Sequence, residues 1–189
     1  DIFVTENSRV YDLGCSTGVM SRVISQQVTD KNVEIVAIDN SPSMIQQCQL
    51  EHAGLSVNWQ CKDLQDVEIQ QASMVVLNLT LQFIKPQQRS ALLEKIFQGL
   101  NPGGVLVLTE KVSYDDEQLQ KTMTELYQGF KKIQGYSDLE ISQKRAALEN
   151  VLIPDGAAVH SQRLKQSGFT EVYECFHCFN FVSYLAIKS

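Results

Sequence analysis

The sequence has no long apolar run and no excess of positive charge. Its 16 lysines and arginines are outnumbered by 22 aspartates and glutamates, which gives a formal net charge of -6. Because a global basic field is missing, direct binding to nucleic acid or to an anionic membrane surface is disfavoured. No stretch has the length and composition of a transmembrane helix or a signal peptide, so we expect no membrane association.

Cysteines are few and scattered, and their odd number of five does not suit a disulfide framework. This pattern indicates a reducing compartment, and we expect the cytoplasm. The C-x-x-C formed by Cys175 and Cys178 lies on an expected strand and has no second pair that would complete a zinc site, so no metal is expected. The five cysteines are Cys15, Cys48, Cys61, Cys175 and Cys178.

Short runs rich in Val, Ile and Leu alternate with longer amphipathic stretches. This alternation, with short connections, predicts a parallel sheet with right-handed crossovers and helices on both faces. The fold class is therefore α/β and doubly wound. The expected buried strands are residues 10–13, 33–38, 57–61, 74–77 and 105–109, and the helices between them are residues 18–28, 42–51 and 87–100.

The pattern changes after Lys111. Residues 115–134 form a long amphipathic segment, and the capping box Ser137-Asp138-Leu139-Glu140 predicts a second helix that ends near Asn150. A further helix over residues 157–167 and strands over 172–176 and 181–187 follow, and we expect these strands to form an antiparallel end of the sheet. The length of 189 residues suits a single domain over residues 1–189, in which residues 111–150 are a helical insertion that contributes to the active site or to a dimer.

The stretch VYDLGCSTGVMSR, residues 10–22, contains two overlapping signatures. Read as G-x-S-x-G, it is the nucleophile elbow of serine hydrolases, with Ser16 as nucleophile and Asp155 and His160 as downstream partners. That elbow needs earlier strands and an upstream loop with an oxyanion-hole amide, which the nine residues before Val10 do not supply. Read as strand, glycine turn and helix start, the same stretch is a nucleotide-cofactor loop, and this interpretation is favoured.

Two acids at strand ends support the cofactor interpretation. Asp39 follows Gly14 by 25 positions, close to the roughly 20-residue offset at which a carboxylate receives ribose hydroxyls. Asp63 follows the third strand and could accept from an adenine amino group, while Leu64 offers a backbone donor. Because the G-C-S-T-G loop lacks the third glycine of pyrophosphate binders, the pattern favours a nucleoside with a short zwitterionic tail, which is S-adenosylmethionine.

Together with these residues, the longer motifs of the sequence resemble a known family, the carboxy-S-adenosyl-L-methionine synthases, a branch of the Rossmann-like class I methyltransferase fold. The resemblance covers residues 10–188 and is most specific in ASMVVLNLTLQF and GYSDLEISQKRAALENV. It implies conversion of S-adenosylmethionine and prephenate to carboxy-S-adenosylmethionine and phenylpyruvate, the product then serving carboxymethylation of the wobble uridine of bacterial tRNA. It also implies a homodimer, and as bound ligand S-adenosylmethionine, its carboxy derivative or S-adenosylhomocysteine.

The resemblance assigns cofactor contacts to a glycine loop, a ribose pair, an adenine pair and a polar group after the fourth strand. Each position also has a purely structural interpretation, such as a tight turn or a helix cap. In the order given, the residues are Gly14, Cys15 and Ser16; Asp39 and Asn40; Asp63 and Leu64; and Asn78.

Arg145 is the catalytic candidate. In the resemblance it corresponds to the arginine that grips the carboxylate of the carboxymethyl group, a task for which a planar bidentate fork suits better than lysine. A solvated arginine on a polar helix is the alternative, and the subunit that supplies Arg145 is left open. Two other functions also stay open: a methyltransferase acting on a small molecule, and a cofactor-binding module without catalysis.

The sequence departs from the family pattern in three places. The loop after Ser16, Thr17-Gly18-Val19-Met20-Ser21, replaces a stretch richer in Ala and Thr. Members carry a further N-terminal segment that covers the site and supplies a tyrosine, whereas this sequence begins at Asp1, close to the first strand. Val182 stands where a glycine is usual. These departures make a divergent member or a shortened chain the expectation.

Overall fold

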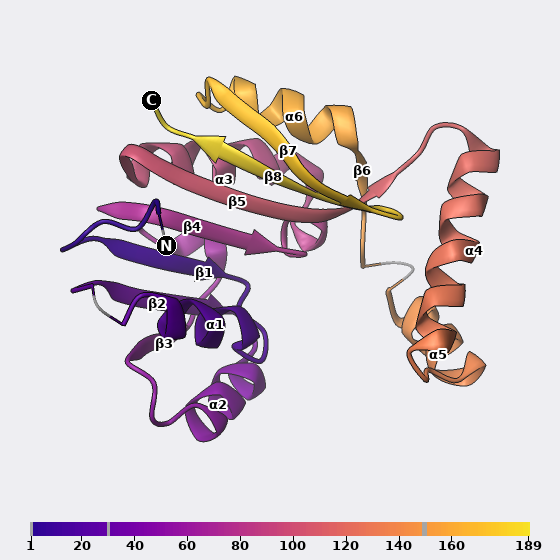
Figure 1. Ribbon diagram of the computed structural model, residues 1–189, viewed down its shortest axis with the longest axis horizontal. Helices are drawn as coiled ribbons and strands as arrows, with labels where there is room; N and C mark the ends of the chain where they lie inside the picture. The colour runs from indigo at the N-terminus through magenta and orange to yellow at the C-terminus, as the bar shows by residue number, and fades with distance from the viewer. Residues whose placement is uncertain (1, 30, 149–150) are drawn as a thin grey trace.

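The computed structural model describes residues 2–29, 31–148 and 151–189 (Figure 1). The strands are β1 (Arg9–Leu13), β2 (Glu34–Asp39), β3 (Val57–Cys61), β4 (Ala72–Asn78), β5 (Leu100–Ser113), β6 (Asp155–Gly156), β7 (Glu171–Cys178) and β8 (Phe181–Ile187). The helices are α1 (Val19–Gln27), α2 (Pro42–Glu51), α3 (Pro86–Gly99), α4 (Glu117–Ile133), α5 (Asp138–Leu148) and α6 (Ala157–Gln166). Short 3-10 turns η1 (Leu64–Asp66) and η2 (Leu81–Phe83) follow β3 and β4.

One sheet runs through the molecule in the order β3-β2-β1-β4-β5-β8-β7, and β6 pairs with the end of β5. Strands β1 to β5 run parallel, whereas β8 is antiparallel to both β5 and β7. The strand order reverses between β1 and β4, which creates the switch point where open α/β sheets bind ligands. The prediction of a doubly wound, mostly parallel α/β sheet with an antiparallel C-terminal strand pair is confirmed.

Side chains of β1, β2, β4 and β5 alternate between two buried clusters, one on each face of the sheet. On β1, Tyr11 belongs to the larger cluster and Val10 to the smaller one. The larger cluster includes Leu92 of α3 and Leu164 of α6, and the smaller one includes Ile24 of α1. Helices therefore cover both faces, which is why the strands consist of near-continuous apolar runs. Among the helices of the described ranges, none is both long and apolar enough to span a bilayer.

Helices α4 and α5 form an arm that stands apart from the sheet beyond the end of β5 (Figure 1). The capping box at its second helix is confirmed, since the Ser137 amide donates to Glu140 Oε2 at 2.8 Å and the Glu140 amide donates to Ser137 Oγ at 3.3 Å. Tyr127 of α4 packs edge-on against Phe181, with ring centroids 4.9 Å apart, and Phe130 packs against Phe179. Aromatic contacts with the β7–β8 hairpin thus join the arm to the body.

Strand β5 begins earlier than predicted. Asn101 to Gly104 were expected to separate α3 from a strand that begins at Val105, but β5 starts at Leu100, directly after α3. Its register with β4 shifts between Ala72 and Met74, so the proline-containing segment forms an irregular part of the ladder. Bulges are among the few places where a sheet tolerates proline, which explains the difference.

Glu110 of β5 carries a fully buried carboxylate that holds η2 in place. Its Oε1 accepts hydrogen bonds from the amides of Thr80 at 3.0 Å and Leu81 at 2.7 Å. Its Oε2 accepts from the amide of Gln82 at 3.0 Å. Burial raises the pKa of Glu110 to about 7, although the three amides oppose this shift.

This raised pKa predicts a pH dependence of stability. Because the folded protein holds the Glu110 proton more tightly than the unfolded chain, the contribution of Glu110 to the free energy of unfolding is fully present below about pH 4.5 and is lost as pH rises toward 7. The slope is at most about 1.4 kcal/mol per pH unit. Urea unfolding between pH 5 and pH 7 should show this decline in the wild type and a shallower one in Glu110→Gln, which cannot titrate. Identical slopes in the two proteins would contradict the prediction.

Candidate functional site

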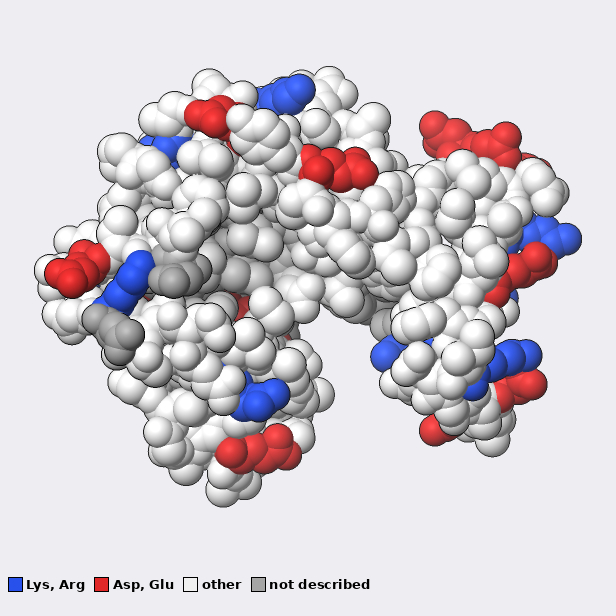
Figure 2. All heavy atoms as spheres, viewed as in Figure 1, with Lys and Arg blue, Asp and Glu red and all other residues white. Residues whose placement is uncertain are grey.

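A cavity of about 960 Å³ lies between the sheet and the arm (Figure 2). Such a volume is at the upper end of ordinary small-molecule sites and can take two small reactants side by side. Its floor is made by the loops after β1, β2, β3 and β4, and its far wall by α4 and α5. The cavity therefore opens at the carboxyl ends of the parallel strands, where the sequence placed the site.

The backbone amides of the glycine loop after β1 donate hydrogen bonds to other groups of the protein. The amides of Gly14 and Cys15 both donate to the carbonyl oxygen of Ile38, at 2.8 and 2.9 Å. The amide of Ser16 donates to Asp39 Oδ2 at 2.9 Å, and that of Gly18 to the Cys15 carbonyl at 2.8 Å. A loop that cradles phosphate turns such amides toward its ligand. These four amides therefore have protein partners and are not turned toward a phosphate group.

A buried carboxylate also steadies this loop. Asp12, at the end of β1, is 1% exposed and accepts a 2.6 Å hydrogen bond from the Ser21 hydroxyl of α1. Burial raises the pKa of Asp12, and the Ser21 hydroxyl opposes that rise. Sequence reasoning did not single out Asp12, although an acid two residues before the loop glycine in DLG was visible.

Gly14 is required by both backbone conformation and space. Its φ is +80°, and a Cβ at this position would lie 2.4 Å from Cγ2 of Thr80. Gly14→Ala is therefore expected to destabilise the fold by about 1 to 3 kcal/mol through overpacking and backbone strain. Because the displaced loop lines the cavity, nucleoside affinity should fall as well. Thermal unfolding and calorimetric titration with S-adenosylmethionine measure the two effects.

A control and a rescue accompany this variant. Gly54→Ala places its methyl group in open space and should change neither quantity. Adding Thr80→Gly to Gly14→Ala removes the atoms that clash and should restore part of the stability. A double variant no more stable than Gly14→Ala would show that the contact with Thr80 is not the cause.

The acids at the strand ends have structural partners and face the cavity. Asp39 Oδ1 accepts from the Ser41 amide at 2.9 Å, so its carboxylate joins the glycine loop to the start of α2. Asp63 Oδ1 accepts from the Gln65 amide at 2.9 Å and caps η1. A carboxylate has about four acceptor positions, so both residues keep capacity for ligand hydroxyl or amino groups. The capping and ligand interpretations are compatible at each acid.

All of the cofactor-binding candidates except Cys15 line the cavity. Cys15 is 6% exposed, and its side chain packs with Ala37 and Ile45 in a small apolar cluster. The expected cofactor contact of Cys15 is through its backbone, so it stays a prediction, while the loop turn directs the side chain under α2. The candidates that line the cavity are Gly14, Ser16, Asp39, Asn40, Asp63, Leu64 and Asn78.

The arm side of the cavity is cationic. Arg145 of α5 lines it together with three lysines, and in Figure 2 basic side chains border the hollow on this side. Burial and the nearby Arg145 guanidinium lower the pKa of Lys111. None of the four cations forms an ion pair with a carboxylate of residues 2–29, 31–148 or 151–189. The lysines, which sequence reasoning did not assign to the site, are Lys111, Lys131 and Lys144.

The hydrolase interpretation finds no support in the geometry. Ser16 lines the cavity, but Asp155 and His160 do not. Asp155 is held by Arg89 and Arg163, and His160 is 1% exposed with both ring nitrogens unpartnered within the described chain. Burial lowers the pKa of His160 to about 4, although Asp155 opposes this shift.

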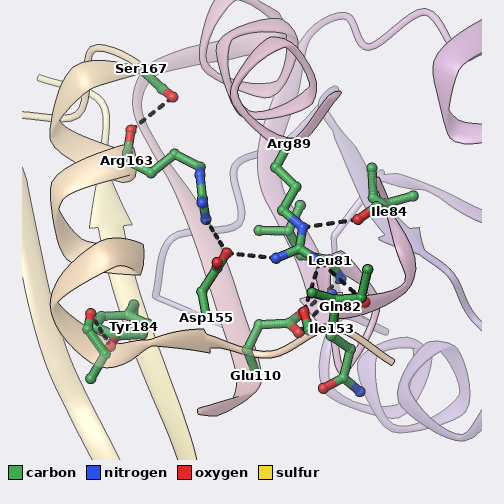
Figure 3. Close-up of polar contacts among 11 residues, drawn as sticks. Leu81, Gln82, Ile84, Arg89, Glu110, Ile153, Asp155, Arg163, Ser167 and Tyr184 are labelled. Carbon is green, nitrogen blue, oxygen red and sulfur yellow. Dashed lines mark hydrogen bonds and ion pairs between the residues drawn. The ribbon is translucent and has the colours of Figure 1, made fainter. Parts of the chain in front are cut away.

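A buried arginine supports the rim of the cavity (Figure 3). Arg89 of α3 donates from Nη1 to Asp155 Oδ2 at 2.6 Å and from Nε to the Ile84 carbonyl at 2.9 Å. Its Nη2 donates to the carbonyls of Ile153 at 2.8 Å and Gln82 at 3.3 Å. The side chain therefore joins η2 to the segment by which the arm returns to the sheet.

A doubly wound sheet with such a cleft is the architecture of the class I methyltransferases, and comparison with known proteins agrees. A family model described as "Methyltransferase domain" matches residues 10–104. Human N-acetylserotonin methyltransferase, solved in complex with S-adenosylmethionine, aligns with a TM-score of 0.65 and 17% identity over 96% of this chain and 47% of its own. An O-methyltransferase family 2 protein from Planctomyces limnophilus, in complex with apigenin, aligns with a TM-score of 0.68 and 15% identity over 97% of this chain and 52% of its own.

Sequence comparison is more specific. A carboxy-S-adenosyl-L-methionine synthase from Shewanella oneidensis is 51% identical over all of this chain and 79% of its own length. The protein of the same name from Shewanella loihica is 48% identical over the same shares. The chain belongs to the carboxy-S-adenosyl-L-methionine synthase family.

Proposed function

We propose that this protein is a transferase that converts S-adenosylmethionine and prephenate to carboxy-S-adenosylmethionine and phenylpyruvate. The observation that carries the proposal is the division of one cavity into an acidic end, with Asp39 and Asp63, and a cationic wall, with Arg145 and Lys111. The acidic end suits the hydroxyl and amino groups of a nucleoside. The cationic wall suits a reactant that carries a carboxylate. An ordinary methyl acceptor does not need a carboxylate.

The cofactor end fits S-adenosylmethionine. Asp39 would accept from the ribose hydroxyls, Asp63 from the adenine amino group, and the loop from Gly14 to Ser16 would border the methionine part. Asn78 has an exposed side chain at the end of β4, free to contact the ligand. When bound, the cofactor supplies an acidic sulfonium methyl group, the position that becomes carboxylated.

The protein's own contribution is positioning and charge. The cavity lies between the sheet and the arm, so both reactants are held next to each other and partly shielded from water. Arg145 would place a bidentate donor where carboxylate charge develops. No side-chain nucleophile is required. Prephenate would lose carbon dioxide and hydroxide as it becomes phenylpyruvate, the carbon dioxide would bond to the sulfonium methyl carbon, and the proton lost from that methyl group would leave with the hydroxide as water.

Mass spectrometry of the reaction tests the proposal. The purified protein is incubated with S-adenosylmethionine, with and without prephenate. A nucleoside heavier than S-adenosylmethionine by the mass of carbon dioxide, formed only with prephenate, is the expected result. If prephenate is inert while the cofactor still binds, the synthase proposal fails, and a small-molecule methyltransferase or a binding module takes its place.

The proposal extends to the setting of the enzyme. The chain would act as one domain in the cytoplasm, and its product would serve carboxymethylation of wobble uridine without direct contact between this chain and tRNA. A homodimer is proposed because α4 has no buried residue yet exposes Leu126, Phe130 and Ile133, the last of them 83% exposed. Sedimentation equilibrium of the purified protein tests the dimer.

A further inference from the structure

Lys111 has an unusual position for a lysine. It lies near the end of β5, opposite Phe181 of β8, and lines the cavity. Since neighbours on a strand point to opposite faces, the buried Glu110 faces the core while Lys111 faces the cavity. Its side chain is half-buried, so the ammonium group has lost part of its hydration and has no carboxylate partner among the described residues.

The surrounding charges increase this cost. Burial is the larger cause of the lowered pKa of Lys111, and the charge of the nearby Arg145 lowers it further. The pKa of Lys131 is lowered by burial and by Lys144 and Lys111. Like charges that face one cavity repel each other, and an anion between them removes the repulsion. A single monocarboxylate held by the Arg145 fork would leave Lys111 still unpaired.

A neighbouring amide points to a ligand at the same place. Asn180, just before β8, is 1% exposed and lines the cavity. Its Oδ1 has no hydrogen-bond partner among the described residues, and its carbonyl oxygen accepts from the Val112 amide at 2.8 Å, which places it beside Lys111. A buried amide without a partner is costly unless something bound supplies one.

We infer that Lys111 and Asn180 form a second anion subsite that, with Arg145, selects a co-substrate with two carboxylates over one with a single carboxylate. This rests on the proposed function, because it assigns the second carboxylate of the same co-substrate. Lys111 provides the charge, and Asn180 Oδ1 accepts a hydrogen bond from a hydroxyl group of the same co-substrate. Arg145 keeps the carboxylate that is transferred.

Steady-state kinetics with Lys111→Met tests the inference, because methionine keeps the length of the side chain and removes its charge. The KM for prephenate should rise about 10- to 100-fold, the effect of losing one charge-assisted hydrogen bond, while kcat changes much less. The dissociation constant of S-adenosylmethionine should stay within about twofold of the wild-type value, because the charge-assisted hydrogen bond lost with Lys111 involves only the co-substrate. Lys111→Arg, which keeps the charge, should recover most of the loss.

The control is Lys121→Met, which removes the same charge from an exposed side chain of α4 that is paired with Glu125. Its KM should equal that of the wild type. An unchanged KM in Lys111→Met overturns the subsite. So does a parallel loss of S-adenosylmethionine affinity, which would place Lys111 at the cofactor's own carboxylate.

Calorimetry separates this inference from the proposed function. If the wild type forms no carboxylated product, the proposed function fails, and binding of prephenate and phenylpyruvate to the cofactor-loaded protein is measured instead. Tighter binding of the dianion prephenate than of the monoanion phenylpyruvate, lost in Lys111→Met, keeps the subsite. Equal binding of the two compounds overturns it. Thermal unfolding confirms that each variant is folded, and Lys111→Gln repeats the test if Lys111→Met is not.

Discussion

Replacing Arg89 with methionine is expected to lower the free energy of unfolding by about 3 to 5 kcal/mol, the usual cost of removing one partner from a buried ion pair. The Arg89 side chain has no exposed surface, and it donates to one carboxylate and three carbonyls. Methionine fills similar volume but leaves these acceptors without their donor. Since a domain is stable by only about 5 to 15 kcal/mol, the variant should unfold at much lower urea concentration.

Asp155 would not lose every partner, because Arg163 lies 2.8 Å from the same Oδ2. Burial would raise the pKa of Asp155, but the hydrogen bonds from Arg89 and Arg163 outweigh burial and lower it. The matched control is Arg9→Met, which breaks an exposed pair with Glu34 at 2.7 Å. That change should cost no more than about 1 kcal/mol. If the free energy of unfolding falls by a similar amount in the two variants, burial does not strengthen the contribution of the Arg89 network.

Replacing Arg145 with alanine is expected to reduce formation of the carboxylated product by about 100- to 1000-fold, as for loss of a positioned donor to developing charge. Arg145 has an exposed side chain that lines the cavity, so alanine removes a ligand contact and leaves no buried group unpaired. Alanine also favours a helix, so α5 should persist. The measurement is product formation by mass spectrometry, with S-adenosylmethionine affinity measured in parallel.

Two further variants sharpen this result. Arg145→Lys keeps the charge but loses the planar fork, so it should recover only part of the activity. Arg22→Ala removes an exposed arginine of α1 that does not line the cavity, and it should behave as the wild type. Full activity in Arg145→Ala would make Arg145 a solvated residue of a polar helix, the alternative that its sequence context leaves open.

Much of the fold could be predicted because its signals are local. Apolar runs of strand length, the helix over residues 42–51 and the capping box at Ser137 each depend on neighbouring residues, and the structure has all of them. Predictions failed where distant pairing decided. The start of β5 depends on a shifted register with β4, and the two-residue β6 exists only because Val112 and Ser113 of β5 lie beside it.

The candidate site divides in the same way. Gly14, Asp39, Asp63 and Asn78 follow strands whose carboxyl ends meet at one edge, so sequence order alone predicts that they converge. The buried direction of the Cys15 side chain could not be predicted, because it depends on the backbone angles of a tight turn. Lys111 gave no signal, since a lysine at the end of a strand is usually solvated.

The sequence by itself determined the α/β class, the parallel strands with their cofactor loop, and the family, because these follow from hydrophobic periodicity, turn residues and long motifs. Only the tertiary structure decided that Lys111 and Arg145, 34 positions apart, face one cavity, and that Arg89 joins the rim to Asp155. The physical reason is that charge and burial depend on which faces of distant segments meet. Those faces are set by the register of β5 with β8 and by the packing of the arm on the β7–β8 hairpin.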